Sequence, residues 1–221
     1  MKAMPLSGAF RLRVAAALLL LVAARLAAQE YRFQFLGADQ GLTNLAIKNL
    51  YQDRKGFLWV STENGIFRYD GYRFRAFGAE EGIPSSSGVA FGEAPDGALL
   101  AGGEIGLFRL VANHFFEKIP LPGGAVVSWA GRIKSDSRGR TWLATDAGLM
   151  VLTESSAGAL TIRTVAAPLG LTDKSTRGML LEHDNLWYGC ALQLCRSVVI
   201  MGAERTIVYD KRAGRNIHRP R

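Results

Sequence analysis

Short runs of alternating apolar and polar residues, separated by turn-forming residues, fill most of the chain after its first 30 positions. Residues 46–52, 58–62, 66–70 and 72–77 form four such runs in succession. Each run has the length of a β-strand, and Gly, Asp, Asn and Lys stand between the runs. The pattern predicts an all-β protein made of short antiparallel strands.

Two kinds of turn connect these runs. Asp53 and Gly56 bracket the first kind, in which the Asp side chain accepts hydrogen bonds from backbone amides and Gly supplies a positive φ. Asn64 and Gly65 form the second kind, the strongest short-range signal for a hairpin. The alternation also puts Trp59 on the buried side of the second run. This segment therefore predicts one sheet of four strands.

The same pattern recurs three more times. Trp59, Leu100, Trp142 and Trp187 hold the same place in the four copies, at steps of 41, 42 and 45 residues. The repeated glycines are Gly56, Gly97 and Gly139 in the Asp turn and Gly65, Gly106 and Gly148 in the hairpin. Four antiparallel strands in about 40 residues are typical of a β-propeller blade. The spacing predicts that Trp59, Trp142 and Trp187 pack in the blades rather than line a ligand pocket.

The first 28 residues follow a different pattern. Lys2, Arg11 and Arg13 precede an unbroken apolar run of eleven residues, and small residues precede Gln29. This order is that of a secretory signal, and the run is shorter than the about 20 residues of a membrane-spanning helix. We expect residues 1–28 to be a cleaved signal peptide and the mature chain to be periplasmic or secreted, without a further membrane span. An uncleaved, membrane-attached anchor is the alternative.

The formal net charge of +8 is concentrated at the two ends of the chain. Residues 29–210 carry 18 basic and 19 acidic residues, whereas residues 1–28 and 211–221 carry nine basic residues and no acids. Nucleic-acid binders concentrate positive charge on the folded body, so we expect no nucleic-acid partner. Residues 29–210 are predicted to form the propeller repeats. Residues 211–221 are predicted to be an irregular basic tail, either a truncation or frameshift product or a natural end.

Individual motifs resemble a known family. The sequence Gln-Asp-Arg-Lys-Gly-Phe-Leu-Trp at 52–59 and Thr-Glu-Asn-Gly-Ile-Phe-Arg-Tyr-Asp-Gly at 62–71 resemble the two-component regulator propeller repeat, as does Gly41-Leu42 before them. The resemblance extends over roughly residues 33–210 and is strongest in the first and third copies. It implies the periplasmic sensor region of a hybrid histidine kinase or a diguanylate cyclase, with a small molecule or glycan as ligand.

Sensors of this family usually carry many more repeats, followed by a membrane helix and a signalling domain. We therefore expect a truncated sensor fragment with an incomplete ring of about four blades, whose open sheet edges invite self-association. Kinase motifs are absent from this sequence. The alternatives are a secreted interaction scaffold, a propeller enzyme such as a lyase, and a remnant of a split gene.

The sequence offers no catalytic or metal-binding constellation. His114, His183 and His218 lack metal-ligand spacing, and no Gly-x-Ser-x-Gly elbow supports a nucleophile in the Ser-Ser-Ser run at 85–87. We therefore expect no enzyme activity, no cofactor and no metal. Trp129 lies outside the repeat register; core packing is the favoured interpretation, and Trp129 is a better candidate for a surface contact than the three repeat tryptophans.

Cys190 and Cys195 flank the hairpin position of the fourth copy, where the first copy has Thr62 and Phe67. Residues facing each other across a hairpin come within disulfide reach, and export provides an oxidising compartment. A local disulfide between Cys190 and Cys195 is the candidate arrangement. Two buried free thiols and a redox-active pair are the alternatives.

Overall fold

The structure is a computed structural model that describes residues 8–9, 33–84, 88–127, 133–165, 176–183, 185–190, 193–200, 203–209 and 216–217. The chain divides into two compact units, Met1–Phe35 and Leu36–Arg221. Nearly all of the predicted signal peptide lies outside the described residues, as do the 85–87 serine run, Trp129 and His218. The fold described below is that of the second unit.

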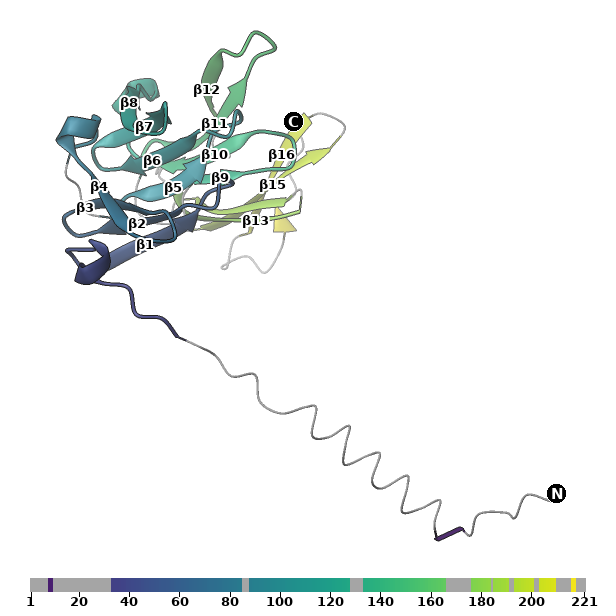
Figure 1. The fold of residues 1–221 in the computed structure, drawn as a ribbon. Coiled ribbons are helices and arrows are strands. Elements are labelled where there is room, and N and C mark those ends of the chain that lie inside the picture. Colours follow the sequence, from purple (N-terminus) through teal and green to yellow (C-terminus); the bar gives the residue numbers. More distant parts are fainter. Residues whose placement is uncertain are drawn as a thin grey trace, which may run out of the picture. The chain divides into compact units, whose positions relative to one another are not determined.

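Four antiparallel sheets follow one another along the chain, one for each predicted repeat (Figure 1). Blade 1 consists of β1 (Ile47–Gln52), β2 (Leu58–Thr62), β3 (Gly65–Tyr69) and β4 (Phe74–Phe77). Blade 2 consists of β5 (Ala90–Glu93), β6 (Leu99–Gly103), β7 (Gly106–Val111) and β8 (Phe115–Ile119). Blade 3 consists of β9 (Ile133–Ser135), β10 (Thr141–Thr145), β11 (Gly148–Glu154) and β12 (Leu160–Thr164).

Blade 4 has a fifth strand. It consists of β13 (Thr176–Glu182), β14 (Asn185–Cys190), β15 (Gln193–Ile200), β16 (Ala203–Tyr209) and β17 (Asn216–Ile217). The two residues of β17 pair with Val208 and Tyr209. The structure thus places two strand residues inside the segment predicted to be irregular, where the outer edge of β16 offers backbone partners.

Blade 1 shows how the sequence builds a blade. Thr62 pairs with Gly65 across a two-residue hairpin turn. The alternation along β2 turns Trp59 to the inside, where it is fully buried. The predicted all-β architecture, with blades of four antiparallel strands, is confirmed.

Consecutive blades meet face to face. β1 contacts β5, β5 contacts β9, and β9 contacts β13, so the first strand of each blade lies along the inner side of the set. Apolar side chains fill each of the three junctions, with Trp59, Phe91 and Phe116 between blades 1 and 2. Blades 2 and 3 enclose Leu100, Ile133 and Leu143, and blades 3 and 4 enclose Trp142, Leu186 and Tyr188.

Short 3-10 turns lead into the first three blades: η1 (Ala38–Gln40), η2 (Ala79–Glu81) and η3 (Pro122–Gly124). Gly41 closes η1 with φ 93°, and a Cβ there would lie 2.8 Å from the carbonyl oxygen of Phe74 in β4. Gly82 closes η2 in the same way against Phe116 in β8. Glycine at these positions lets each link lie directly on the outer strand of the blade that it enters.

Candidate functional site

The turn between the first and second strands of a blade is fixed by its aspartate. Asp53 accepts hydrogen bonds from the backbone amides of Lys55 and Phe57, both at 3.0 Å. Its second carboxylate oxygen accepts the indole N–H of Trp59 at 2.8 Å. Gly56 completes the turn at φ 89°. The carboxylate therefore holds both the turn and the blade's central tryptophan.

Blade 3 repeats this arrangement. Asp136 accepts the backbone amides of Arg138 and Arg140, both at 3.0 Å, and the indole N–H of Trp142 at 2.9 Å. Burial alone would raise the pKa of Asp136, but hydrogen bonds from Arg140 and Trp142 and the charge of Arg140 lower that pKa overall. The negative charge is therefore stabilised in the folded chain.

Blade 2 departs from the pattern at two positions. Leu100 stands where the other copies have tryptophan, and Ala94, whose backbone makes the same turn bonds with Gly97 and Ala98, stands where blades 1 and 3 have the aspartate. Asp96, two residues further on, accepts the backbone amide of Ala98 and pairs with the guanidinium of Arg109. In blade 4 the aspartate predicted on the turn, Asp184, lies outside the described residues.

Each of the three repeat tryptophans has an arginine over its ring. Arg68 lies opposite Trp59 in the sheet, with its guanidinium carbon 5.6 Å from the ring centroid. Arg196 lies 5.2 Å from the ring of Trp187, and Arg140 lies 4.8 Å from that of Trp142. Partial burial, followed by the charge of Arg75, lowers the pKa of Arg68. These distances are within the range of cation–π contacts.

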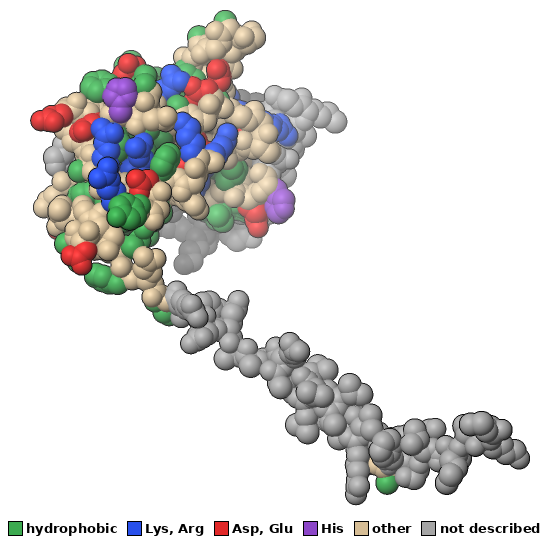
Figure 2. Space-filling view, in the orientation of Figure 1, with side chains coloured by type: hydrophobic (Ala, Val, Ile, Leu, Met, Phe, Trp, Pro, Cys, Tyr) green, Lys and Arg blue, Asp and Glu red, His purple; other side chains and the backbone are tan. Residues whose placement is uncertain are grey.

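One end of the first three blades, which we call the Asp-turn face, carries the aspartate turns and a concentration of basic side chains. Figure 2 shows Lys and Arg side chains gathered on the face in view, with single acidic side chains among them. The basic residues at or near these turns are Arg54, Lys55, Arg68, Arg109, Arg138 and Arg140. Three of them, Arg54, Arg109 and Arg140, form salt bridges with acidic residues.

The opposite end, which we call the hairpin face, has a different charge. The hairpins of blades 1 to 3 carry Glu63, Glu104 and Asp146 at their tips. Lys48 pairs with Glu63 at 2.6 Å. The two ends of the blades therefore differ in their electrostatic character, although residues 29–210 are nearly neutral.

Glu93 joins three blades at the Asp-turn face. Its carboxylate accepts the backbone amide of Arg54 at 2.8 Å and lies 2.7 Å from Nε of the same residue. Its backbone carbonyl accepts the hydroxyls of Ser135 and Thr141 in blade 3, each at 2.7 Å. Burial, followed by the charge of Glu93, raises the pKa of Tyr51 to about 12.

On the same face, the ammonium group of Lys55 donates a hydrogen bond to Oδ1 of Asn113 at 2.7 Å. Arg68 donates to the carbonyl oxygen of the same residue at 3.0 Å. Asn113 belongs to the turn between β7 and β8, so basic side chains of blade 1 reach a turn of blade 2. Two cationic donors of blade 1 are thereby held near one another at its junction with blade 2, which suits the binding of an anionic group.

In the described part of the chain, no group of three or more His, Cys, Asp or Glu side chains is arranged to hold a metal ion. His114 has its Nδ1 at 2.8 Å from the carbonyl oxygen of Ala112. Within the same residues, no helix is both long and apolar enough to cross a bilayer.

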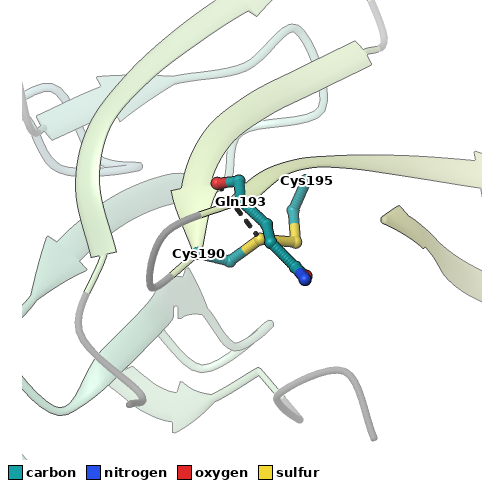
Figure 3. The surroundings of a disulfide bond; sticks show 3 residues. All are labelled: Cys190, Gln193 and Cys195. Atoms are coloured by element: carbon teal, nitrogen blue, oxygen red, sulfur yellow. Dashed lines mark hydrogen bonds between the residues drawn. A yellow bond between two sulfur atoms is a disulfide. The ribbon is translucent and has the colours of Figure 1, made fainter. Parts of the chain in front are cut away.

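The two cysteines form a disulfide in blade 4, with Cα atoms 5.9 Å apart (Figure 3). They are not directly opposed, because Cys190 pairs with Gln193 and Cys195 with Tyr188. The bond instead connects diagonal neighbours on one face of the hairpin. Both cysteines are buried against blade 3. In blades 1 and 3 the position of Cys190 is held by Thr62 and Thr145, whose hydroxyls bond to Gly65 and Gly148.

The repeat tryptophans and glycines lie on separate blades and do not come together in one site. Trp59 and Trp142 are fully or almost fully buried, whereas Trp187 in the last blade is only half-buried. Gly56, Gly97 and Gly139 have φ between 72° and 89°, and Gly65, Gly106 and Gly148 have φ between 114° and 147°. The indole–carboxylate bond and the basic face were not predicted from the sequence. The six-residue spacing of Asp and Trp that the first and third copies share was the available signal for the first.

These features define a set of β-propeller blades held by aspartate turns and interblade packing. Residues 41–64 match the family model described as Two component regulator propeller. This match at residues 41–64 agrees with the resemblance to the two-component regulator propeller repeat seen in the sequence. No curated protein matches the chain.

Solved structures with a similar fold include two extracellular domains from B. thetaiotaomicron. The domain of the hybrid two component system BT3049 is 18% identical, with a TM-score of 0.58 over 85% of this chain and 31% of that one. The domain of the one component system BT4673 is 20% identical, with a TM-score of 0.59 over 86% and 24%. A streptogramin B lyase is 15% identical, with a TM-score of 0.51 over 79% and 56%.

At these identities the likeness concerns the fold alone. The chain spans about a third or less of the length of these two extracellular domains. Any activity, ligand or partner of such longer proteins is therefore a matter for proposal.

Proposed function

We propose that this chain is the ligand-sensing propeller portion of an exported two-component receptor. The observation that carries the proposal is the family repeat at residues 41–64, whose Asp–Gly–Trp turn recurs with the same hydrogen bonds at Asp136 and Trp142. The sequence contains no kinase motif, so this portion would supply sensing and no catalysis of its own. Its output would come from a kinase or cyclase domain elsewhere in the receptor.

Export is the second part of the proposal. The pattern of residues 1–28 is that of a secretory signal. A disulfide such as Cys190–Cys195 persists in an oxidising compartment, which agrees with a periplasmic or secreted location. Signal cleavage can be checked by mass spectrometry of the N-terminus of the exported chain, which we expect near Gln29. An intact N-terminus on an exported chain would instead indicate an anchor.

The ligand we propose is a small molecule or glycan with carboxylate or sulfate groups, bound at the Asp-turn face. Lys55 and Arg68, both of blade 1, converge there on Asn113 of blade 2, and the two cationic side chains would share one ligand. Charge-assisted hydrogen bonds to an anion are stronger than those between neutral groups. The hairpin face, with Glu63, Glu104 and Asp146 at its tips, offers the opposite charge.

The ligand proposal is tested by calorimetry of the mature chain with neutral, uronate-containing and sulfated oligosaccharides. We expect binding of anionic members only, weakened about tenfold by Lys55→Ala, which corresponds to about 1.4 kcal/mol. Lys48→Ala is the matched control, because Lys48 is a half-exposed lysine paired with Glu63 on the other face. Equal binding of neutral and anionic sugars, or equal effects of the two variants, would argue against this site.

Self-association is a further part of the proposal. Leu50 in β1 is 55% exposed, and Leu180 and Leu194 in blade 4 are 61% and 46% exposed. Large apolar side chains exposed on sheet surfaces favour association with another chain. Sedimentation velocity of the mature chain should show a weight-average mass that increases with concentration. A monomer at every concentration up to about 100 μM would contradict this expectation.

The receptor assignment itself is tested in the DNA that follows codon 221. We expect one of the reading frames to continue with Asp-x-x-Gly-x-x-Trp repeats and then a membrane helix and a signalling domain. An intergenic region without repeats would overturn the receptor assignment and favour the secreted scaffold.

A further inference from the structure

Blade 1 holds two arginines directly opposite each other. Arg68 in β3 and Arg75 in β4 are partners in the register of these two strands. The side chains of such a pair leave the sheet on the same face, with their Cβ atoms about 4.5–5.5 Å apart, and like charges at this distance destabilise the sheet. This pair therefore adds an unfavourable electrostatic interaction to blade 1.

The equivalent pairs of the other blades avoid this repulsion. Each of them contains only one arginine: Arg109 and Glu117 in blade 2, Val151 and Arg163 in blade 3, and Arg196 and Ile207 in blade 4. In blade 2 the partner of the arginine even has the opposite charge. A blade of this repeat therefore forms without a second arginine at this position, and the second arginine of blade 1 is available for another role.

Acidic neighbours neutralise the pair only in part. Among the described residues, Glu81 alone forms a salt bridge with either arginine, and its Oε1 lies 3.7 Å from Nη2 of Arg75. The other oxygen of Glu81 accepts the backbone amide of Gly78 at 2.9 Å. Arg68 donates to the carbonyl oxygen of Asn113 at 3.0 Å, and this acceptor carries no full charge. The two arginines thus share a single carboxylate.

Two more acids act on Arg68 without pairing with it. Burial and then the charge of Arg75 lower the pKa of Arg68. The charges of Asp53 and Asp70 act on this pKa in the opposite direction without reversing the change. Asp53 is occupied by its own turn and by the indole of Trp59, and Asp70 accepts backbone amides of its own turn. Neither carboxylate therefore serves as the counter-charge of Arg68.

Aromatic rings fix both guanidinium groups. The guanidinium carbons of Arg75 and Arg68 lie 5.1 Å and 5.4 Å from the centroid of the Phe77 ring. That of Arg68 also lies 4.6 Å from the ring centroid of Phe57. Cation–π contacts hold a cation without cancelling its charge. Because the side chain of Arg75 is 50% exposed, an anion can reach the pair from solvent.

Lys55 brings a third cation to this part of the blade. It donates to Oδ1 of Asn113 at 2.7 Å, and Arg68 donates to the carbonyl oxygen of the same residue. A carboxylate has two coplanar oxygens, which suit the fork of one guanidinium. A tetrahedral oxyanion has three or more oxygens in different directions and accepts hydrogen bonds from several cations at once. Three neighbouring cations therefore favour a tetrahedral group over a carboxylate.

We propose that Arg68, Arg75 and Lys55 bind a tetrahedral oxyanion, a sulfate or phosphate group of the ligand, beside the junction between blades 1 and 2. This inference rests on the proposed function, in which an anionic ligand binds at the Asp-turn face, and it specifies a tetrahedral rather than a planar anionic group. The bound oxyanion would supply the counter-charge that the opposed arginines lack, so that their repulsion in the free chain favours the complex.

NMR titrations of the mature chain, residues 29–221, with methyl sulfate and acetate at about pH 7 test this preference, because both probes carry one negative charge. We expect methyl sulfate to bind at least about tenfold more tightly than acetate at constant ionic strength. Methyl phosphate, compared with methyl sulfate at about pH 5, where its charge is also close to one, identifies which ester fits better. Acetate binding as tight as that of methyl sulfate would overturn the proposal.

Two variants in equivalent strands separate the arginine pair from a general effect of charge. Arg75→Gln should weaken methyl sulfate binding by at least about tenfold, because it removes one charge-assisted donor. Arg163→Gln is the matched control and should change the affinity by less than about twofold. Arg163 holds the same register position in blade 3, where its partner is Val151 rather than an arginine. Equal losses in the two variants would overturn the proposal.

Thermal unfolding in dilute chloride buffer separates binding from a purely structural role of Arg75. Arg75→Gln should not lower the Tm by more than about 3 °C, since the repulsion from Arg68 is lost together with the contact to Glu81. A larger decrease would show that Arg75 serves the fold and would overturn the proposal.

Failure of this site and failure of the proposed function give different results. If methyl sulfate binding depends on Arg75 but no oligosaccharide binds, the proposed ligand class is wrong and the oxyanion site stands. If Lys55→Ala weakens oligosaccharide binding and Arg75→Gln does not, the ligand site stands and the role of the arginine pair is overturned.

Discussion

Equivalent positions in the first strands of the blades have very different surroundings. Phe91 and Ile133, which face the preceding blade, are 3% and 2% exposed. Leu50 holds the same register position in blade 1 and is 55% exposed. The same repeat therefore buries a side chain at a junction and exposes it at an end. What stabilises a blade is its neighbour, as is general for repeat architectures.

The other end shows the same contrast. Trp59 and Trp142 each face a following blade and are 0% and 2% exposed, while Trp187 in blade 4 is half-buried. Arg196 lies over the ring of Trp187 much as Arg68 lies over Trp59. Blade 4 thus keeps the contact between arginine and tryptophan, although its tryptophan is not buried as those at the junctions are.

The largest effect is expected for tryptophan in a junction. Trp59→Ala should lower the free energy of unfolding by about 3–5 kcal/mol, because it removes a fully buried ring between blades 1 and 2. Trp187→Ala should cost about 1–2 kcal/mol, because that ring is only half-buried. Urea denaturation followed by circular dichroism measures both. Equal losses would mean that the end face of blade 4 is covered in solution.

Aliphatic residues on the face that turns toward the preceding blade should also contribute more to the free energy of unfolding at a junction than at the end of the set, with smaller losses than for tryptophan. Ile133→Ala should cost about 2–4 kcal/mol, since Ile133 packs against Gly92 and leaves a cavity when truncated. Leu50→Ala is its counterpart and should change the free energy of unfolding by less than about 0.5 kcal/mol. The same urea experiment compares them. A loss of more than about 1 kcal/mol for Leu50→Ala would contradict the exposure of Leu50 on the outer face of blade 1.

The disulfide should have a moderate effect. Reduction of Cys190–Cys195 opens a very short loop, for which the chain-entropy argument gives about 2 kcal/mol. Thermal unfolding with and without dithiothreitol should show a lower Tm for the reduced chain. The double variant Cys190→Ala, Cys195→Ala should be insensitive to dithiothreitol, so a shift that persists in it would have another origin.

The smallest effect is expected in the stability of the fold at acidic pH. The pKa of Asp136 is lowered in the folded chain, so its ionised form contributes stability above the unfolded pKa of about 3.9, and this is lost as the pH falls through the folded pKa. Asp136→Asn should therefore reduce the pH dependence of stability below about pH 4. Trp142→Phe, which removes one donor to the carboxylate, should reduce it less. An unchanged acid profile in both variants would show that this carboxylate is not specially stabilised.

The sequence was sufficient to predict the strands and the blades, because alternation and turn residues are local signals. The Asp-x-x-Gly turn was predicted to bond backbone amides, and Asp53 does so. Its bond to the indole of Trp59 was not predicted, because it depends on how the strand curls back over the turn. The pairing of Asp96 with Arg109 was not predicted either, because it joins residues 13 positions apart.

The candidate binding surface could not be predicted from the sequence. Lys55 and Asn113 are 58 residues apart, and only the packing of blade 1 on blade 2 brings them within 2.7 Å.

The central claim, that blade faces are closed at junctions and open at the ends, is tested most directly by thiol labelling. Leu50→Cys, Phe91→Cys and Ile133→Cys would be compared in dilute, native, unreduced protein, in which Cys190 and Cys195 are bonded to each other. We predict that the thiol at position 50 reacts as rapidly as in the unfolded chain, and that the thiols at 91 and 133 react only through unfolding. Equal protection of all three positions would contradict the claim.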